Sequence, residues 1–83
     1  MDYALVKEQG VTFAVVVVKS HALNNVHSRD DLKMSYQPYF PGAHIILMAQ
    51  NSRGVPQYYG KTDIVNFLSR IDHRRLPWKR KNI

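Results

Sequence analysis

The most regular hydrophobic pattern in the chain lies in residues 11–19. β-Branched residues dominate this segment, and both of its alternating faces are apolar. A strand of this kind belongs in the interior of a sheet. The domain covers both of its faces, or it covers one face and an oligomer contact covers the other. Residues 3–7 predict a partner strand. Residues 8–10 could form a hairpin turn between the two, although Gly10 fits a bulge equally well.

A second buried strand and an edge strand are expected further along. Residues 43–49 are almost entirely apolar, and residues 51–54 carry turn-forming side chains. Residues 55–59 should then return antiparallel to residues 43–49. Because Pro56 has no backbone N–H to donate, we expect the returning strand at the edge of the sheet.

Two helices are also expected. Ser28 can accept a hydrogen bond from the backbone N–H of Asp31, which predicts a helix start at Ser28. Pro38 and Pro41 should keep this helix short. Residues 62–71 predict a helix with one buried face, because apolar residues recur there at helical spacing. These residues are Ile64, Val65, Phe67, Leu68 and Ile71.

The resulting order, β(β)αββα, predicts a small α+β fold with three to four strands and two helices. We expect a compact domain over residues 1–72 and a basic tail over residues 73–83, docked through Trp78. The order of strand, helix, antiparallel hairpin and terminal helix over residues 11–71 is similar to the thioredoxin pattern. The redox Cys-x-x-Cys motif of that fold is absent, so the resemblance implies no redox function.

Composition narrows the class of protein further. The 83 residues are 45% hydrophobic and 22% charged, which is typical of a globular domain. The absence of cysteine excludes disulfides, thiol catalysis and cysteine-based metal sites. The longest apolar run, residues 13–18, is far shorter than a membrane span, and the N-terminus lacks the basic start of a signal peptide. We therefore expect a cytoplasmic protein without a membrane partner.

Positive charge is concentrated near the C-terminus. The last fourteen residues hold six of the twelve Lys and Arg residues but only one of the six acids. Lys and Arg neutralise phosphates, and Trp can stack on a base or anchor the segment to its own domain. We therefore predict a non-enzymatic domain that binds nucleic acid or another polyanion without strong sequence preference. The candidate residues are Arg70, Arg74, Arg75, Trp78, Lys79, Arg80 and Lys81.

Other interpretations of the same segment remain open. It could bind an acidic protein, or it could be a solvated end that only aids solubility. A protein–protein interaction module, such as a homodimer formed through the sheet, is an alternative function. Two helices could leave one sheet face uncovered, and an exposed apolar face favours association.

A second candidate surface contains Arg53, Tyr58, Tyr59 and Lys61. Tyr58 and Tyr59 are adjacent on the expected edge strand, so they should face opposite ways. One should pack in the core, which leaves the other to stack on a base near Arg53 and Lys61. Packing of both tyrosines within the domain is the competing interpretation.

A small hydrolase or metal site around His21 and His27 is the third hypothesis. Both follow the first buried strand and precede Asp30 and Asp31, and ligand crevices open at the carboxyl ends of strands. The spacing of the two histidines is not a standard metal-ligand pattern, however, and a polar loop with two histidines is more often only a solvated loop. We therefore assign no catalytic residue, metal ligand or cofactor.

Overall fold

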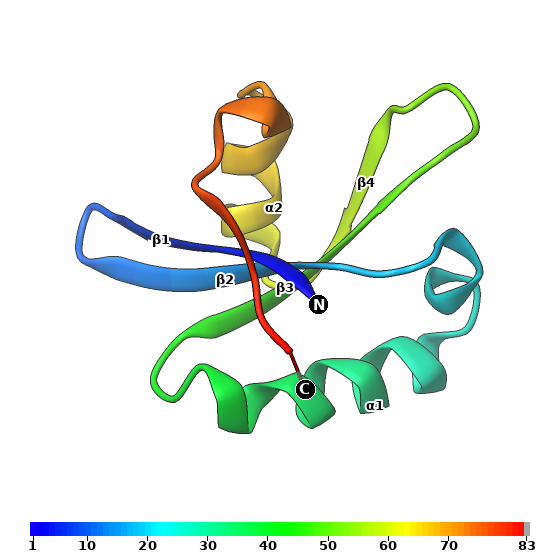
Figure 1. Ribbon diagram of the computed structural model, residues 1–83, viewed down its shortest axis with the longest axis horizontal. Helices are drawn as coiled ribbons and strands as arrows, with labels where there is room; N and C mark the ends of the chain where they lie inside the picture. The colour runs from blue at the N-terminus through cyan, green and yellow to red at the C-terminus, as the bar shows by residue number, and fades with distance from the viewer. Residues whose placement is uncertain (83) are drawn as a thin grey trace.

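In the computed structural model, which describes residues 1–82, one mixed five-stranded sheet lies between two α-helices (Figure 1). Figure 1 shows α2 above the sheet and α1 below it. This arrangement confirms the α+β class. The number of strands differs from the three to four predicted, because β5 near the C-terminus was not expected.

The elements alternate between strands, helices and short 3₁₀ turns. In chain order they are β1 (Asp2–Glu8), β2 (Val11–Val17), η1 (Ser20–Leu23), α1 (Val26–Tyr36), η2 (Gln37–Tyr39), β3 (His44–Gln50), β4 (Pro56–Tyr59), α2 (Thr62–Ser69), η3 (His73–Arg75) and β5 (Trp78–Arg80).

The strand order across the sheet is β4-β3-β2-β1-β5. β2 and β3 are parallel because the crossover through α1 connects them, and the other neighbouring strands are antiparallel. β4 lies at one edge, which confirms the position predicted from Pro56. The carboxyl ends of β2 and β3 lie at the same end of the sheet, where a ligand crevice commonly forms.

The core has two apolar layers, one on each face of the sheet. On the α2 side, Phe13 and Val15 pack with Ile64 and Leu68 of the helix. The opposite layer contains the alternate positions of β2 together with Leu23 of η1, residues of α1, and Phe40 after η2. β2 therefore occupies the sheet interior as predicted, with both faces covered. Complete burial of a side chain such as Phe13 contributes roughly 1.5–3 kcal/mol relative to exposure.

Backbone conformation explains the hairpin turn, and side-chain hydrogen bonds explain where the first helix begins. Gln9 and Gly10 both have positive φ angles, 51° and 79°, which suit a tight two-residue turn between β1 and β2. The start of α1 differs from the prediction. The Asn25 side chain accepts from the backbone N–H groups of His27 and Ser28, so the helix begins about one turn earlier than expected.

The second helix follows a close approach of the backbone to β3. A Cβ atom on Gly60 would lie 2.5 Å from Ile46 Cδ1 and 3.1 Å from the Ile45 carbonyl oxygen, so only glycine fits without rearrangement. α2 ends at Ser69, and Ile71 of the predicted apolar stripe lies outside the helix.

None of the helices formed by residues 1–82 is long and apolar enough to cross a lipid bilayer.

Candidate nucleic-acid interface

The chain after α2 folds back over the sheet. Asp72 Oδ1 accepts from the backbone N–H of Arg74 at 3.0 Å, which caps the turn η3. Leu76 then enters the α2-side core and is only 8% exposed. Trp78 packs against the same layer, and its indole Nε1–H donates to the His73 carbonyl oxygen at 2.8 Å. Two apolar anchors therefore fix the position of the basic segment.

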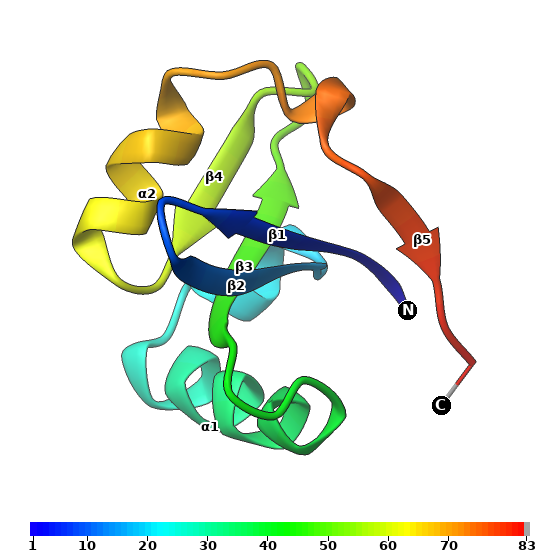
Figure 2. The ribbon, with the colours of Figure 1, turned by 90° about the vertical axis from the view of Figure 1, so that its left-hand side faces the viewer.

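Contacts between the N-terminal and the C-terminal residues of the chain hold β5 along β1. The two strands pair antiparallel, with Ala4 opposite Trp78 and Asp2 opposite Arg80. Arg80 Nε lies 2.9 Å from Asp2 Oδ1, and this hydrogen bond lowers the pKa of the Asp2 carboxyl. The pairing continues beyond the strand, because the backbone N–H of Lys81 donates to the Met1 carbonyl oxygen at 2.8 Å. Figure 2 shows the chain passing from α2 across the top of the molecule to β5, which runs down the right-hand edge.

The cations of this segment differ in their partners. Arg74 binds the Asp72 carboxylate through Nε and Nη2, at 3.0 and 2.9 Å. This pair and the cap to the Arg74 N–H lower the pKa of Asp72 to about 2. Arg74 and Arg80 are therefore already engaged by carboxylates. Within residues 1–82, no ion pair involves the four remaining cations, Arg70, Arg75, Lys79 and Lys81.

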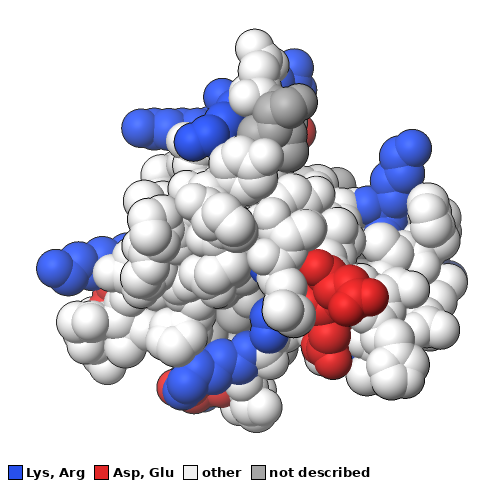
Figure 3. Space-filling view, turned by 90° about the horizontal axis from the view of Figure 1, so that it is seen from below, with Lys and Arg blue, Asp and Glu red and all other residues white. Residues whose placement is uncertain are grey.

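The α1 face does not present a single basic patch. Figure 3 views this face and shows Lys and Arg around its outline, with an acidic group near the middle right. A further group of cationic side chains lies at the top of the view. On this face, positive charge is therefore spread around the rim of the molecule.

A groove of about 470 Å³ adjoins β5, and we call it the β5 groove. Val17, Met48 and Trp78 supply its apolar surface. Gln50 and His73 lie at the same groove, and their Nε2 atoms are 2.9 Å apart. Asp2, Lys79 and Arg80 complete the lining. Because Val17 and Gln50 are the last residues of the parallel strands β2 and β3, the groove opens at their carboxyl ends.

The second candidate surface is divided between the two faces of the sheet. Tyr58 packs into the α2-side layer, where burial raises the pKa of its hydroxyl. Tyr59 faces the α1 side, and its hydroxyl donates to the Asp30 carboxylate, which raises the pKa of Tyr59. The guanidinium carbon of Arg29 lies 4.1 Å from the centre of the Tyr59 ring, so an internal cation already covers that ring.

The basic residues of that second surface are also separated from one another. Arg53 lies in the exposed turn between β3 and β4. Lys61 precedes α2, and its Nζ pairs with Asp63 Oδ2 at 2.9 Å. The four residues therefore do not form one binding site.

His21 and His27 are exposed on η1 and α1, respectively. Among residues 1–82, no three His, Asp or Glu side chains come together in a way that could hold a metal ion. The histidine hypothesis therefore gains no support from the geometry. His21 lies beside the end of β2 on the α1 side, in a hollow with Val17 and Lys19, and His73 reaches the other face of the same strand ends from the C-terminal segment.

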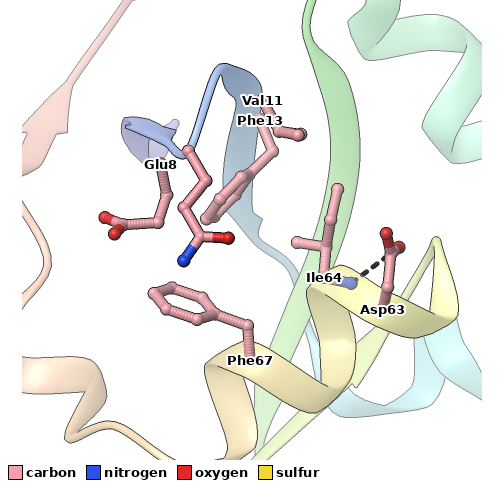
Figure 4. Close-up of a pocket in the computed structure, with 7 residues that line it drawn as sticks. Glu8, Val11, Phe13, Asp63, Ile64 and Phe67 are labelled. Carbon is pink, nitrogen blue, oxygen red and sulfur yellow. Dashed lines mark hydrogen bonds between the residues drawn. The ribbon is translucent and has the colours of Figure 1, made fainter.

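A smaller cavity of about 220 Å³ lies between the β1–β2 hairpin and α2 (Figure 4). Phe13, Ile64 and Phe67 form its apolar walls, with the two phenylalanine rings edge to face at 6.2 Å. Glu8 and Asp63 contribute carboxylates to the lining, as Figure 4 shows. This charge disfavours a polyanion, so the β5 groove is the better candidate for an anionic ligand.

Comparison with known proteins gives no relative for this chain. No family model, curated protein or solved structure matches it. The similarity to the thioredoxin pattern is therefore limited to the order of elements, and the function has to be argued from the site.

Several groove residues were not among the predicted site residues. Trp78, Lys79 and Arg80 were predicted, whereas Val17 and Met48 were interpreted only as strand positions and Gln50 was assigned no role. The available signal was the position of Val17 and Gln50 at the ends of two buried strands. Whether those ends meet beside the basic segment depends on the strand order, which the sequence does not reveal.

Proposed function

We propose that the protein binds nucleic acid, or a polyanion of similar charge density, through the exposed cations of its C-terminal segment. The observation that supports this most directly is that Arg70, Arg75, Lys79 and Lys81 are exposed and have no ion pair among residues 1–82. Each such cation can displace a condensed counterion from a phosphate chain, which favours binding at low salt.

The anchoring of the segment supports the same proposal. Leu76 and Trp78 pack into the core, and β5 pairs with β1, so the backbone that carries the cations is already ordered. Binding of a polyanion then costs less conformational entropy than it would for a free tail. The backbone that carries Lys79 and Lys81 is therefore preorganised.

The competing role for these residues is protection of the sheet edge. Lys and Arg on a short edge strand discourage pairing with other chains, and β5 is such a strand. This role requires no affinity for anions, so a binding measurement separates the two interpretations. The homodimer hypothesis depended on an uncovered sheet face, whereas α1 and α2 each cover one face.

The proposal is tested with a labelled single-stranded oligonucleotide and fluorescence anisotropy at low salt. The variant to compare with the native protein is Arg75→Glu with Lys79→Glu. Arg74 is left intact because its reversal would also disrupt the contact with Asp72. The matched control is Lys7→Glu with Lys33→Glu, which changes the net charge equally but lies outside the segment.

We expect micromolar binding by the native protein and by the control. The C-terminal variant should bind on the order of tenfold more weakly or worse, because two phosphate contacts become repulsive. Equal weakening of both variants would show that net charge alone matters. Absence of native binding at low salt would reject the proposal and leave edge protection as the role of these residues.

A further inference from the structure

The β5 groove combines a flat apolar wall with hydrogen-bonding groups and positive charge. Trp78 is half-buried, and its Nε1–H is fixed on the His73 carbonyl oxygen, so the orientation of its ring is set before any ligand arrives. Met48, only 3% exposed, lies beneath the groove, and Val17 adds a second aliphatic surface. The volume of about 470 Å³ is within the usual range for small organic groups, about 300–1,000 Å³.

We propose that this groove takes one unpaired base of a bound nucleic-acid single strand. The base lies against Trp78, and the adjoining phosphates are near Lys79 and Arg80. This inference depends on the proposed function, since it identifies which nucleic acid the cationic segment binds. A base within a duplex is stacked between its neighbours and cannot enter such a groove, whereas a single strand offers its bases to aromatic side chains.

The polar groups of the groove suit the edge of a base. Gln50 Nε2 donates to the Gly54 carbonyl oxygen at 3.2 Å and lies 2.9 Å from His73 Nε2. These contacts use the amide nitrogen, so the amide oxygen of Gln50 can accept from an exocyclic amino group. The Gln50 amide and the His73 imidazole can make only a few hydrogen bonds to a base. The groove should therefore accept different bases without strong preference.

The charge of the groove favours an anionic ligand. Among residues 1–82, Asp2 is the only acid in its lining, and the Arg80 contact already compensates it. That contact uses Nε, and the Arg80 side chain remains 77% exposed. Lys79 also lines the groove, but its side chain points to the opposite face of the sheet from Trp78, because Lys79 pairs with Tyr3 of the α1-side layer. A nucleotide has both an apolar ring and a negatively charged phosphate. It therefore complements the apolar wall and the positive charge of the groove better than an uncharged ring or an acidic side chain does.

Trp78 is the single tryptophan of the chain, so its intrinsic fluorescence reports on the groove directly. The experiment titrates the native protein with a short oligo(dA) strand and with an abasic strand that has the same number of phosphates. Anisotropy of a label on each strand gives the affinity, and Trp78 emission shows whether a base reaches the indole. Adenosine monophosphate serves as the free-nucleotide control.

We expect oligo(dA) to quench Trp78 and to bind about 5- to 100-fold more tightly than the abasic strand, as base–aromatic stacking predicts. The abasic strand should bind without quenching. Gln50→Ala should reduce the preference for oligo(dA) and leave abasic binding unchanged, while the control Gln57→Ala on β4 should alter neither.

Equal affinity for both strands without quenching would overturn the groove assignment but leave the polyanion function intact. Failure of every strand to bind would reject both proposals. Quenching by adenosine monophosphate without any strand binding would show that the groove is a site for a free nucleotide, which contradicts the proposed occupant.

Discussion

At the residue scale, two adjacent arginines of the basic segment have different roles. Arg74 binds Asp72 through a two-point contact and helps to shape the turn η3. Arg75 is exposed and has no ion pair among residues 1–82. Counting charges in the sequence treats the two alike. The structure assigns Arg74 to folding and leaves Arg75 available for a ligand.

The Asp72 contact predicts a specific dependence of stability on pH. The pKa of Asp72 falls from 3.8 to about 2 in the folded protein, chiefly because of the hydrogen bond from Arg74. A lowered folded-state pKa stabilises the fold above 3.8, and this contribution disappears as the pH falls towards 2. Urea unfolding of the native protein and of Asp72→Asn should therefore converge at low pH. Parallel curves for the two proteins across this range would disprove the role of Asp72.

At the scale of elements, the basic segment is part of the sheet. β5 has three residues, follows Pro77 and lies among cations, so no hydrophobic pattern marks it as a strand. It forms because Leu76 and Trp78 pack in the core and bring the chain beside β1. Removal of the chain after Ile71 would therefore remove core residues together with the charges, which makes substitutions the cleaner test of binding.

Leu76→Ala should lower the free energy of unfolding by about 2–3 kcal/mol, the lower part of the range for a leucine in a core. The side chain is 8% exposed and belongs to the α2-side layer, so its loss leaves a cavity under β5. Equilibrium urea unfolding measures the change, with Leu5→Ala as a matched control because Leu5 is 50% exposed. Similar losses for the two variants would mean that Leu76 does not anchor the segment.

The other elements could be predicted where burial or spacing was unambiguous. β2 and β3 were evident from their apolar runs, and α2 from apolar residues at helical spacing. The start of α1 was displaced because Asn25 and Ser28 are both good capping residues, and Asn25 is the one that caps the helix. Competition between two such residues is decided by tertiary packing, which a single sequence does not show.

At the scale of the whole molecule, strand order decides which candidate residues meet. The order β4-β3-β2-β1-β5 places Trp78 near the ends of β2 and β3, so the β5 groove is built from segments distant in sequence. The alternation of side chains along β4 puts Tyr58 and Tyr59 on opposite faces, as the sequence predicted. His21 and His27 belong to no group of metal ligands within residues 1–82. The sequence could indicate a basic binding segment, but not the groove beside it.

The salt dependence of oligonucleotide binding tests the central claim most directly. If Arg70, Arg75, Lys79 and Lys81 each contact a phosphate of a single strand, the logarithm of the affinity should fall against the logarithm of salt concentration with a slope of about −3. Arg75→Glu with Lys79→Glu should reduce the slope to about −1.5, since two contacts remain. A slope near zero, or an unchanged slope in this variant, would contradict the assignment of the C-terminal segment as the nucleic-acid interface.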